Sequence, residues 1–197
     1  MTNTGTSTSN MTGKVMTVNG PIDPSEVGMC IMHEHLFIDF WRDKEPGYNA
    51  PATDVAHWNE KLTLENLHLA RSRKPIKDNF LLTDEKVTIN DVMAFRNLGG
   101  KTVVDVTNIG LGRDPQALQR VANATGLNIV MGSGWYQRFY HPADMDQRTV
   151  QNLAEEIIQD INVGVGKTGV RSGIIGEVGV NGNPITPNEE KSILKWV

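Results

Sequence analysis

His33 and His35 are separated by one residue. This spacing is the feature of the chain that most directly predicts a chemical role, the binding of a metal ion. The two histidines follow the apolar run 29–32, which is typical of a β-strand. Side chains at i and i+2 of a strand share a face, so both imidazoles can reach one point while Glu34 faces away. Imidazole nitrogens held this way are ligands for zinc or a similar divalent ion. The alternative is two histidines in a loop, because a chain with five histidines can hold such a pair by chance.

Two acidic residues inside otherwise apolar runs are the next candidates. Glu177 lies in the segment 172–178, where a carboxylate must be paired, bound to a metal or displaced to the rim. A structural ion pair with Arg171 is the alternative interpretation. Asp105 interrupts a valine-rich strand. It could orient a ligand histidine, or it could accept a hydrogen bond from a neighbouring backbone N–H.

The elements that must position these side chains alternate between strand and helix. Such alternation predicts parallel strands joined by crossover helices, and the carboxyl ends of these strands are where α/β barrels place their active sites. An eight-stranded barrel of about 250 residues and a doubly wound sheet are both compatible with the pattern. The predicted strands are 29–33, 101–107, 127–131 and 172–178, and the predicted helices are 88–98, 115–125, 149–162 and 187–197.

The flanking and connecting segments are less regular. Residues 1–13 are mostly small and polar, and we expect them to form a disordered tail. A short strand at 14–18 is followed by turn-forming residues at 19–21. The segment 41–75 is predicted to be an elaborated loop that contains a helix over 54–72.

Composition excludes several classes of protein. The net charge of -4 provides no broad positive field for a nucleic acid. A single cysteine, Cys30, rules out an intrachain disulfide and a thiolate cluster for zinc. No apolar run approaches the roughly 20 residues that cross a bilayer, and the first residues lack the pattern of a secretory signal. We therefore expect a cytoplasmic protein without nucleic-acid or membrane partners.

A set of motifs resembles the phosphotriesterase-like family of the amidohydrolase superfamily. The resemblance extends from about Lys14 to the last residue, and the motifs occur in the family's order. They are Gly20-Pro21-Ile22, Met32-His33-Glu34-His35-Leu36, Thr102-Val103-Val104-Asp105-Val106-Thr107, Gly110-Leu111-Gly112-Arg113-Asp114, Gly132-Ser133-Gly134-Trp135-Tyr136 and Gly173-Ile174-Ile175-Gly176-Glu177-Val178-Gly179.

The resemblance implies a (β/α)8 barrel with two divalent metal ions, zinc in many members, bridged by a carboxylate and a hydroxide. His33 and His35 match the ligands of the more buried metal. Glu177 matches the bridging position, where several members carry a carboxylated lysine and others, as here, a glutamate. Lys167, the nearest lysine, lies in the preceding loop and cannot replace it. A carboxylate bridge offsets the repulsion between two dications about 3.5–4 Å apart.

The implied activity is hydrolysis of a small-molecule lactone, carboxylic ester or phosphotriester by the bridging hydroxide. Trp135 and Tyr136 resemble the loop that lines the substrate pocket, although aromatic packing against the barrel rim is the alternative. The three other histidines match no ligand position and are expected at the surface. They are His57, His68 and His141.

The family draws two further histidines and a general-base aspartate from strands that would follow Val197. We therefore expect residues 14–197 to be the N-terminal half of the barrel, with about four β/α units, and to be inactive alone. The alternative is a non-catalytic metal-binding or interaction module derived from such a hydrolase. Whether the full-length protein forms a homodimer is left open.

Overall fold

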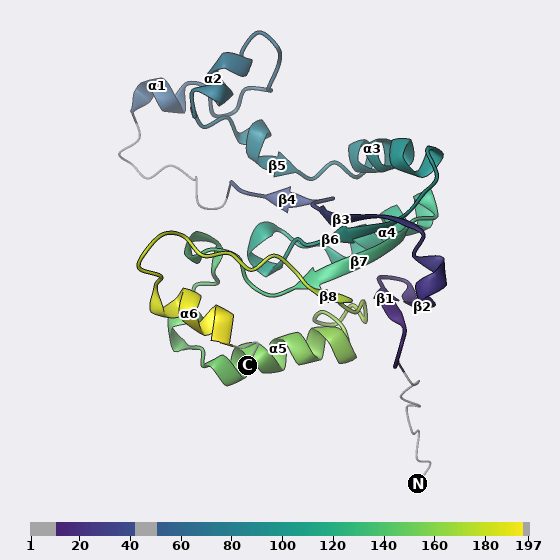
Figure 1. The fold of residues 1–197 in the computed structure, drawn as a ribbon. Coiled ribbons are helices and arrows are strands. Elements are labelled where there is room, and N and C mark those ends of the chain that lie inside the picture. Colours follow the sequence, from purple (N-terminus) through teal and green to yellow (C-terminus); the bar gives the residue numbers. More distant parts are fainter. Residues whose placement is uncertain (1–10, 42–50, 195–197) are drawn as a thin grey trace.

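The computed structural model describes residues 11–41 and 51–194. Its centre is a four-stranded parallel sheet in which each strand pairs with the next one along the chain (Figure 1). A doubly wound sheet reverses its strand order, whereas this order does not reverse. The arrangement is that of half a (β/α)8 barrel. Its strands are β3 (Met29–Glu34), β6 (Gly100–Asp105), β7 (Asn128–Ser133) and β8 (Ile174–Ile175).

Three helices connect the strands, and each starts at a capping residue. Helix α4 (Pro115–Thr125) and helix α5 (Val150–Asn162) confirm the predicted starts, with Asp114 and Thr149 accepting backbone N–H groups of the first turn. Helix α3 (Glu85–Asn97) begins three residues before its predicted start, because the Asp84 side chain accepts the N–H groups of its first turn.

The sheet separates two apolar layers, as the alternation of side chains along a strand requires. On one face, Val103 and Ile129 pack against α3 and α4 in the larger core. On the other face, Val104, Val106 and Val130 form a smaller cluster on the side that faces the barrel interior.

At the amino ends of the strands, a hairpin of β1 (Val15–Thr17) and β2 (Gly20–Ile22) packs against the sheet. The N–H of Val18 donates to the carbonyl of Ile129 at 2.8 Å. The sequence predicted β1, but it assigned a turn at 19–21. The turn falls one residue earlier, because Thr17 Oγ1 donates to Gly20 O and accepts from Asn19 N. A 3-10 helix, η1 (Pro24–Glu26), then leads to β3.

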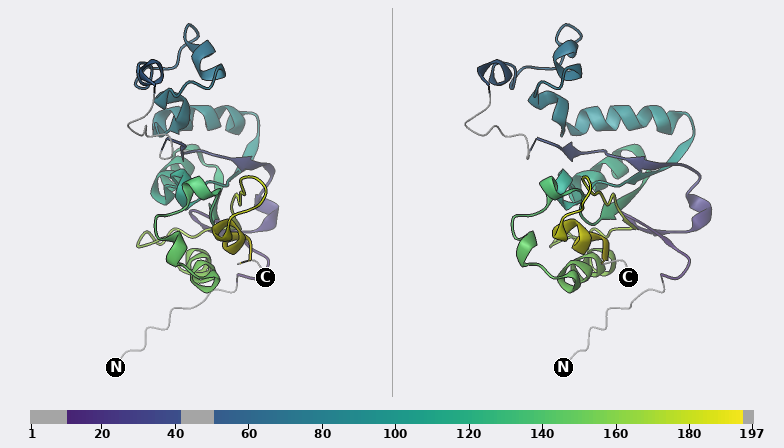
Figure 2. Two further views of the ribbon diagram at one scale, coloured as in Figure 1. Left: turned by 90° about the vertical axis from the view of Figure 1, so that its left-hand side faces the viewer. Right: turned by 60° about the vertical axis from the view of Figure 1, so that its left-hand side comes forward.

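The segment after β3 leaves the sheet and projects from it (Figure 2). Strands β4 (Ile38–Asp39) and β5 (Leu81–Leu82) form an unpredicted antiparallel pair at its base. The predicted helix over 54–72 is wrong: only α1 (Ala52–Val55) and α2 (Leu67–Arg71) are helical there. The Asn66 side chain bonds the backbone of Thr63 and Lys61, and such local bonds compete with a helix.

The last segments are shorter than predicted. Only Ile174 and Ile175 of the strand expected at 172–178 pair in the sheet, as β8. Helix α6 (Pro187–Leu194) follows, and residues 1–10 of the expected tail and 195–197 of the expected helix lie outside the described residues. In the ranges 11–41 and 51–194, no helix has the length and apolarity to cross a membrane. The remaining 3-10 helices are η2 (Lys77–Phe80), η3 (Ile109–Leu111), η4 (Arg138–Tyr140) and η5 (Met145–Gln147).

Candidate metal centre

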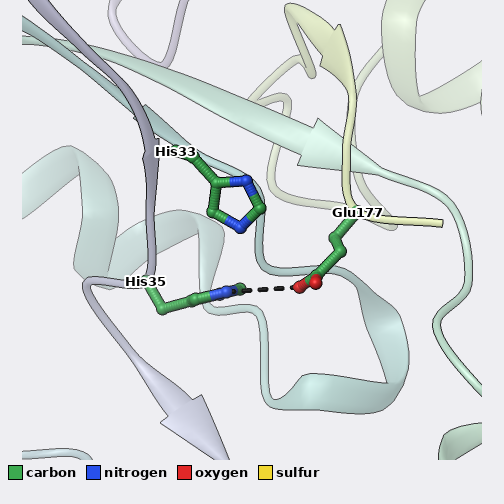
Figure 3. Close-up of side chains that lie close together, drawn as sticks. All are labelled: His33, His35 and Glu177. Carbon is green, nitrogen blue, oxygen red and sulfur yellow. Dashed lines mark ion pairs between the residues drawn. The ribbon is translucent and has the colours of Figure 1, made fainter. Parts of the chain in front are cut away.

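Three predicted ligands meet at the carboxyl ends of the strands. One ligand atom from each of His33, His35 and Glu177 lies within 4.8 Å of the other two (Figure 3). His33 and His35 come from the end of β3, and Glu177 follows β8. Among the residues that the structure describes, this is the one group of three such side chains close enough to hold a metal ion.

A bulge in β3 helps to aim the two histidines. Ile31 pairs with Val103, and Glu34 pairs with Asp105, so β3 has one residue more than β6 between these two pairs. Bulges of this kind redirect side chains next to functional sites. The two imidazole rings lie edge to face with centroids 5.5 Å apart. A regular strand, as assumed from the sequence, also brings these two histidines together, but it does not include the bulge.

Thr107 determines which nitrogen of His35 faces the centre. The Thr107 hydroxyl donates its hydrogen to the carbonyl of Phe37 at 3.1 Å, so it can only accept from His35 Nδ1, which lies 2.9 Å away. The hydrogen of the neutral ring is therefore on Nδ1, and Nε2 presents its lone pair. Burial lowers the pKa of His35 and favours this neutral form, although the charge of Glu177 opposes the shift.

The Nε2 atom of His35 lies 3.3 Å from Glu177 Oε2. A lone pair facing a carboxylate oxygen is repulsive, and a cation that accepts both donors removes the repulsion. Two imidazoles and one carboxylate are also a donor set that divalent zinc accepts. The residues present therefore fit a metal ion. Without one, the same contact is favourable only as an ion pair with a protonated imidazole.

The backbone of Glu177 is held on both sides by the end of β6. Its N–H donates to Val106 O at 3.1 Å, and its carbonyl accepts from Asn108 Nδ2 at 2.6 Å. A Cβ atom at the preceding residue, Gly176, would lie 2.7 Å from Val106 O, so the close approach requires glycine. The proposed ion pair with Arg171 is not formed, because that guanidinium donates to the carbonyl of Ile161 at 2.6 Å.

Asp105 is fully buried one strand away from the histidines. Its carboxylate accepts from the backbone N–H of Leu36 at 2.7 Å and of Thr107 at 3.0 Å. Asp105 therefore accepts backbone N–H groups, which was one of the two interpretations of its role. The other was contact with a histidine, and Thr107 makes that contact instead. Burial raises the pKa of Asp105 to about 6, although the hydrogen bonds oppose this shift. Asp105 thus fixes the chain on either side of the centre.

The two aromatic residues predicted for a substrate pocket have different environments. Trp135 is fully buried and packs with Met145, Leu153 and Ile157, so it belongs to the core and does not line a pocket. Tyr136 is half-buried, and its pKa is raised by burial and then by the charge of Glu177.

Tyr136 belongs to an aromatic group whose members are far apart in the sequence. Its ring centroid lies 6.3 Å from that of Phe40 and 5.6 Å from that of Tyr140. Phe40 and Tyr140 also contact each other, with centroids 5.3 Å apart. The one sequence feature that could have indicated a place for Phe40 near the centre is its position shortly after the histidine pair. Nothing in the pattern linked it to residues about 100 positions later.

The other histidines lie outside the centre. His57 contacts Glu60 at 2.8 Å, and the exposed His68 contacts the carbonyl of Glu65. His57 and His141 are both partly buried rather than at the surface, and Nε2 of His141 lies 2.9 Å from the carbonyl of Tyr136.

Comparison with known proteins finds a family that matches nearly the whole chain. The profile of the phosphotriesterase family matches residues 13–196. An N-acetyltaurine hydrolase from Tetraodon nigroviridis is 34% identical over 189 residues, which are 95% of this chain and 53% of that protein. The chain thus spans about half the length of the curated relatives it matches.

Two crystal structures are similar to this half-barrel. A resiniferatoxin-binding protein from Rhodobacter sphaeroides is 35% identical, with a TM-score of 0.83 over 92% of this chain and 50% of that one. The phosphotriesterase homology protein from Escherichia coli, solved with phosphate in its active site, is 27% identical, with a TM-score of 0.65 over 86% of this chain and 48% of that one. The predicted barrel class is confirmed. With a family profile that covers nearly all of its length, the chain belongs to the phosphotriesterase family.

Proposed function

We propose that this chain contributes the first half of the active site of a metal-dependent hydrolase that cleaves ester-type or amide bonds of small molecules. The observation that carries the proposal is the meeting of His33, His35 and Glu177 at the carboxyl ends of the parallel strands. In α/β barrels this end of the strands is where catalysis takes place. The relatives support the class of reaction, because several are named as hydrolases.

In this proposal the centre takes two divalent ions, most simply zinc. His33 and His35 would hold one ion, and Glu177 would contribute a carboxylate to both. Metal ions bound in such a centre polarise a carbonyl or phosphoryl oxygen and make water acidic enough to act as a nucleophile near neutral pH. The remaining ligands implied by the family resemblance, two histidines and an aspartate, match no position among residues 1–197.

The protein's own contribution would be to hold the ligands in place. Thr107 keeps Nε2 of His35 directed at the centre, and the anionic Glu177 offsets part of the metal charge. Tyr136 lies where the charge of Glu177 influences its hydroxyl, so it could hydrogen-bond the oxygen or nitrogen that leaves the substrate. The group of Phe40, Tyr136 and Tyr140 would offer an aromatic wall beside the reacting bond.

Four classes of bond should be compared as substrates. The family resemblance points to lactones, carboxylic esters and phosphotriesters, and the N-acetyltaurine hydrolases add the amide bond that their name specifies. Specificity in barrels of this kind resides in loops at the carboxyl ends of the strands. The aromatic wall favours substrates with an apolar group next to the scissile bond.

The test is a hydrolysis assay of the full-length protein, loaded with zinc, cobalt or manganese, against one substrate of each class. We expect metal-dependent turnover of at least one substrate, and its loss when Glu177 is replaced by Gln. Turnover that survives metal removal would contradict the proposal. The competing function is a non-catalytic metal-binding module. It predicts a stable, monodisperse protein that binds about one metal ion and hydrolyses none of the substrates.

A further inference from the structure

Asn108 is buried beside the metal centre and makes an unusual set of bonds. It has no exposed surface, and its Nδ2 donates to the backbone carbonyl of Glu177 at 2.6 Å. A carbonyl can only accept, so this contact fixes which end of the amide faces Glu177. The other end, Oδ1, is then buried without a hydrogen-bond partner in the part of the chain that the structure describes.

An unsatisfied oxygen in the interior lowers stability and therefore needs an explanation. A leucine of similar size would avoid the unsatisfied atom and would still fill the space. What the amide supplies, and leucine cannot, is the donor that holds the Glu177 carbonyl. The bond thus serves the position of Glu177 rather than the packing of its own surroundings.

The two residues before Asn108 in the sequence also bond to residues of the metal centre. Val106 O accepts the N–H of Glu177, and Thr107 Oγ1 accepts from Nδ1 of His35. The three consecutive residues 106–108, which come directly after β6, therefore hold His35, which follows β3, and Glu177, which follows β8. Because both peptide groups of Glu177 are held, only its side-chain torsions remain free to move the carboxylate.

We propose that Asn108 is a positioning residue of the metal centre, which fixes the carboxylate of Glu177 so that the carboxylate and the two histidines bind a metal ion together. This inference rests on the function proposed above. Groups that orient metal ligands typically raise metal affinity by about 10- to 100-fold. Asn108 need not touch the metal or the substrate to have this effect.

The test compares zinc affinity with the stability of the metal-free protein. Asn108→Leu removes the donor while keeping the volume. Asn128→Leu is the matched control, because Asn128 Nδ2 donates to the carbonyl of Glu26 at 3.1 Å at the start of β7, which is the far end of the strand from the centre. Zinc affinity is measured by competition with a chelator, and the melting temperature of the zinc-free protein is measured alongside.

We expect Asn108→Leu to weaken zinc binding by at least about tenfold and Asn128→Leu to leave it within about twofold of the wild type. Asn128→Leu should lower the melting temperature of the zinc-free protein, because it removes the bond to Glu26 O without relieving a buried unsatisfied atom. If Asn108→Leu does not fold, Asn108→Ala removes the same donor without adding volume, and the same shift is expected. If neither variant folds while Asn128→Leu does, the role of Asn108 is structural and the proposal is overturned.

The outcomes separate this inference from the proposed function. Wild-type zinc affinity in a folded Asn108→Leu variant would overturn the positioning role alone, provided that the wild type binds zinc and His35→Ala does not. A wild-type protein that binds no zinc would overturn the proposed function, and this inference with it.

Discussion

The two ends of the parallel sheet are built differently. At the amino ends, the N–H of Val18 in the turn of the hairpin β1–β2 donates to Ile129 O, and Thr102 Oγ1 donates to Val27 O in the segment that leads to β3. At the carboxyl ends, polar side chains reach from one strand to the next, beside the group of His33, His35 and Glu177. Asp105, Thr107 and Asn108 all bond the chain next to His35 or Glu177.

The difference indicates which end serves stability and which serves function. Bonds at the amino ends tie the hairpin and the strand starts to one another, and they leave no group of three metal-ligating side chains in the described residues there. At the carboxyl ends, Thr107 and Asn108 instead bond His35 and Glu177, whose Nε2 and Oε2 atoms lie 3.3 Å apart, and under the proposed function a cation would stabilise this contact. Substitutions at the two ends should therefore affect different measurements.

The largest effect is expected from Glu177→Gln. The amide keeps the shape but loses the charge and one acceptor oxygen, so we expect zinc affinity to fall by more than about 100-fold. Glu189→Gln is the control, because this fully buried carboxylate of α6 accepts the N–H groups of Asn181 and Thr186 and has no role in the centre. It should lower the free energy of unfolding and leave zinc affinity unchanged. Equal zinc affinities for Glu177→Gln and wild type would contradict the bridging role.

Asp105 predicts a pH effect at the carboxyl end. Because its pKa is raised from 3.8 to about 6 in the folded protein, the fold favours the protonated acid. This contribution is fully present below pH 3.8 and is lost as the pH rises through 6. Two pKa units correspond to about 3 kcal/mol. The zinc-free wild type should therefore lose about that much stability between pH 4 and 7, relative to Asp105→Asn.

The measurement for this prediction is urea unfolding of both proteins at a series of pH values. The comparison cancels the other titrating groups, which are the same in the two proteins. If the two stability curves run parallel between pH 4 and 7, the buried carboxyl group does not titrate as described.

Thr107→Val tests the orientation of His35. Valine has the same shape but cannot accept the Nδ1 hydrogen, so the ring is no longer held with Nε2 toward the centre. We expect zinc affinity to fall about tenfold, as is typical for the loss of a partner that orients a ligand. Unchanged affinity, measured by chelator competition, would show that the ring is oriented without the hydroxyl.

The smallest effect is expected from the same substitution at the other end, Thr102→Val. It removes the bond of the Thr102 hydroxyl to Val27 O and should cost about 1 kcal/mol of unfolding free energy. Zinc affinity should equal that of the wild type. A loss of affinity as large as that of Thr107→Val would remove the distinction between the two ends.

Local sequence signals predicted much of the fold. Pro115 marked the start of α4, and Thr149 marked the start of α5, because the signals for a helix start depend on residues that are adjacent in sequence. The histidine pair and Glu177 were found in the same way, since an apolar strand makes a polar residue conspicuous. The motifs then supplied the order of the strands.

The contacts between distant segments could not be read from the sequence. Thr107 looked like an ordinary strand residue, and its role depends on His35, which lies 72 positions away. The bonds of Asn108 to Glu177 and of Asp105 to Leu36 span 69 positions each. Tertiary packing determines these pairs. Tertiary packing also places Trp135 in the core. Its position in the sequence was compatible both with lining a substrate pocket and with packing against the barrel rim.

X-ray absorption at the zinc edge tests the central claim most directly. The zinc-loaded wild type should show two imidazole nitrogens at about 2.0–2.1 Å together with oxygen ligands. In the His33→Ala and His35→Ala variants, one imidazole should be lost from the spectrum or zinc should not bind. A wild-type spectrum without imidazole, or one that neither variant changes, would contradict the account.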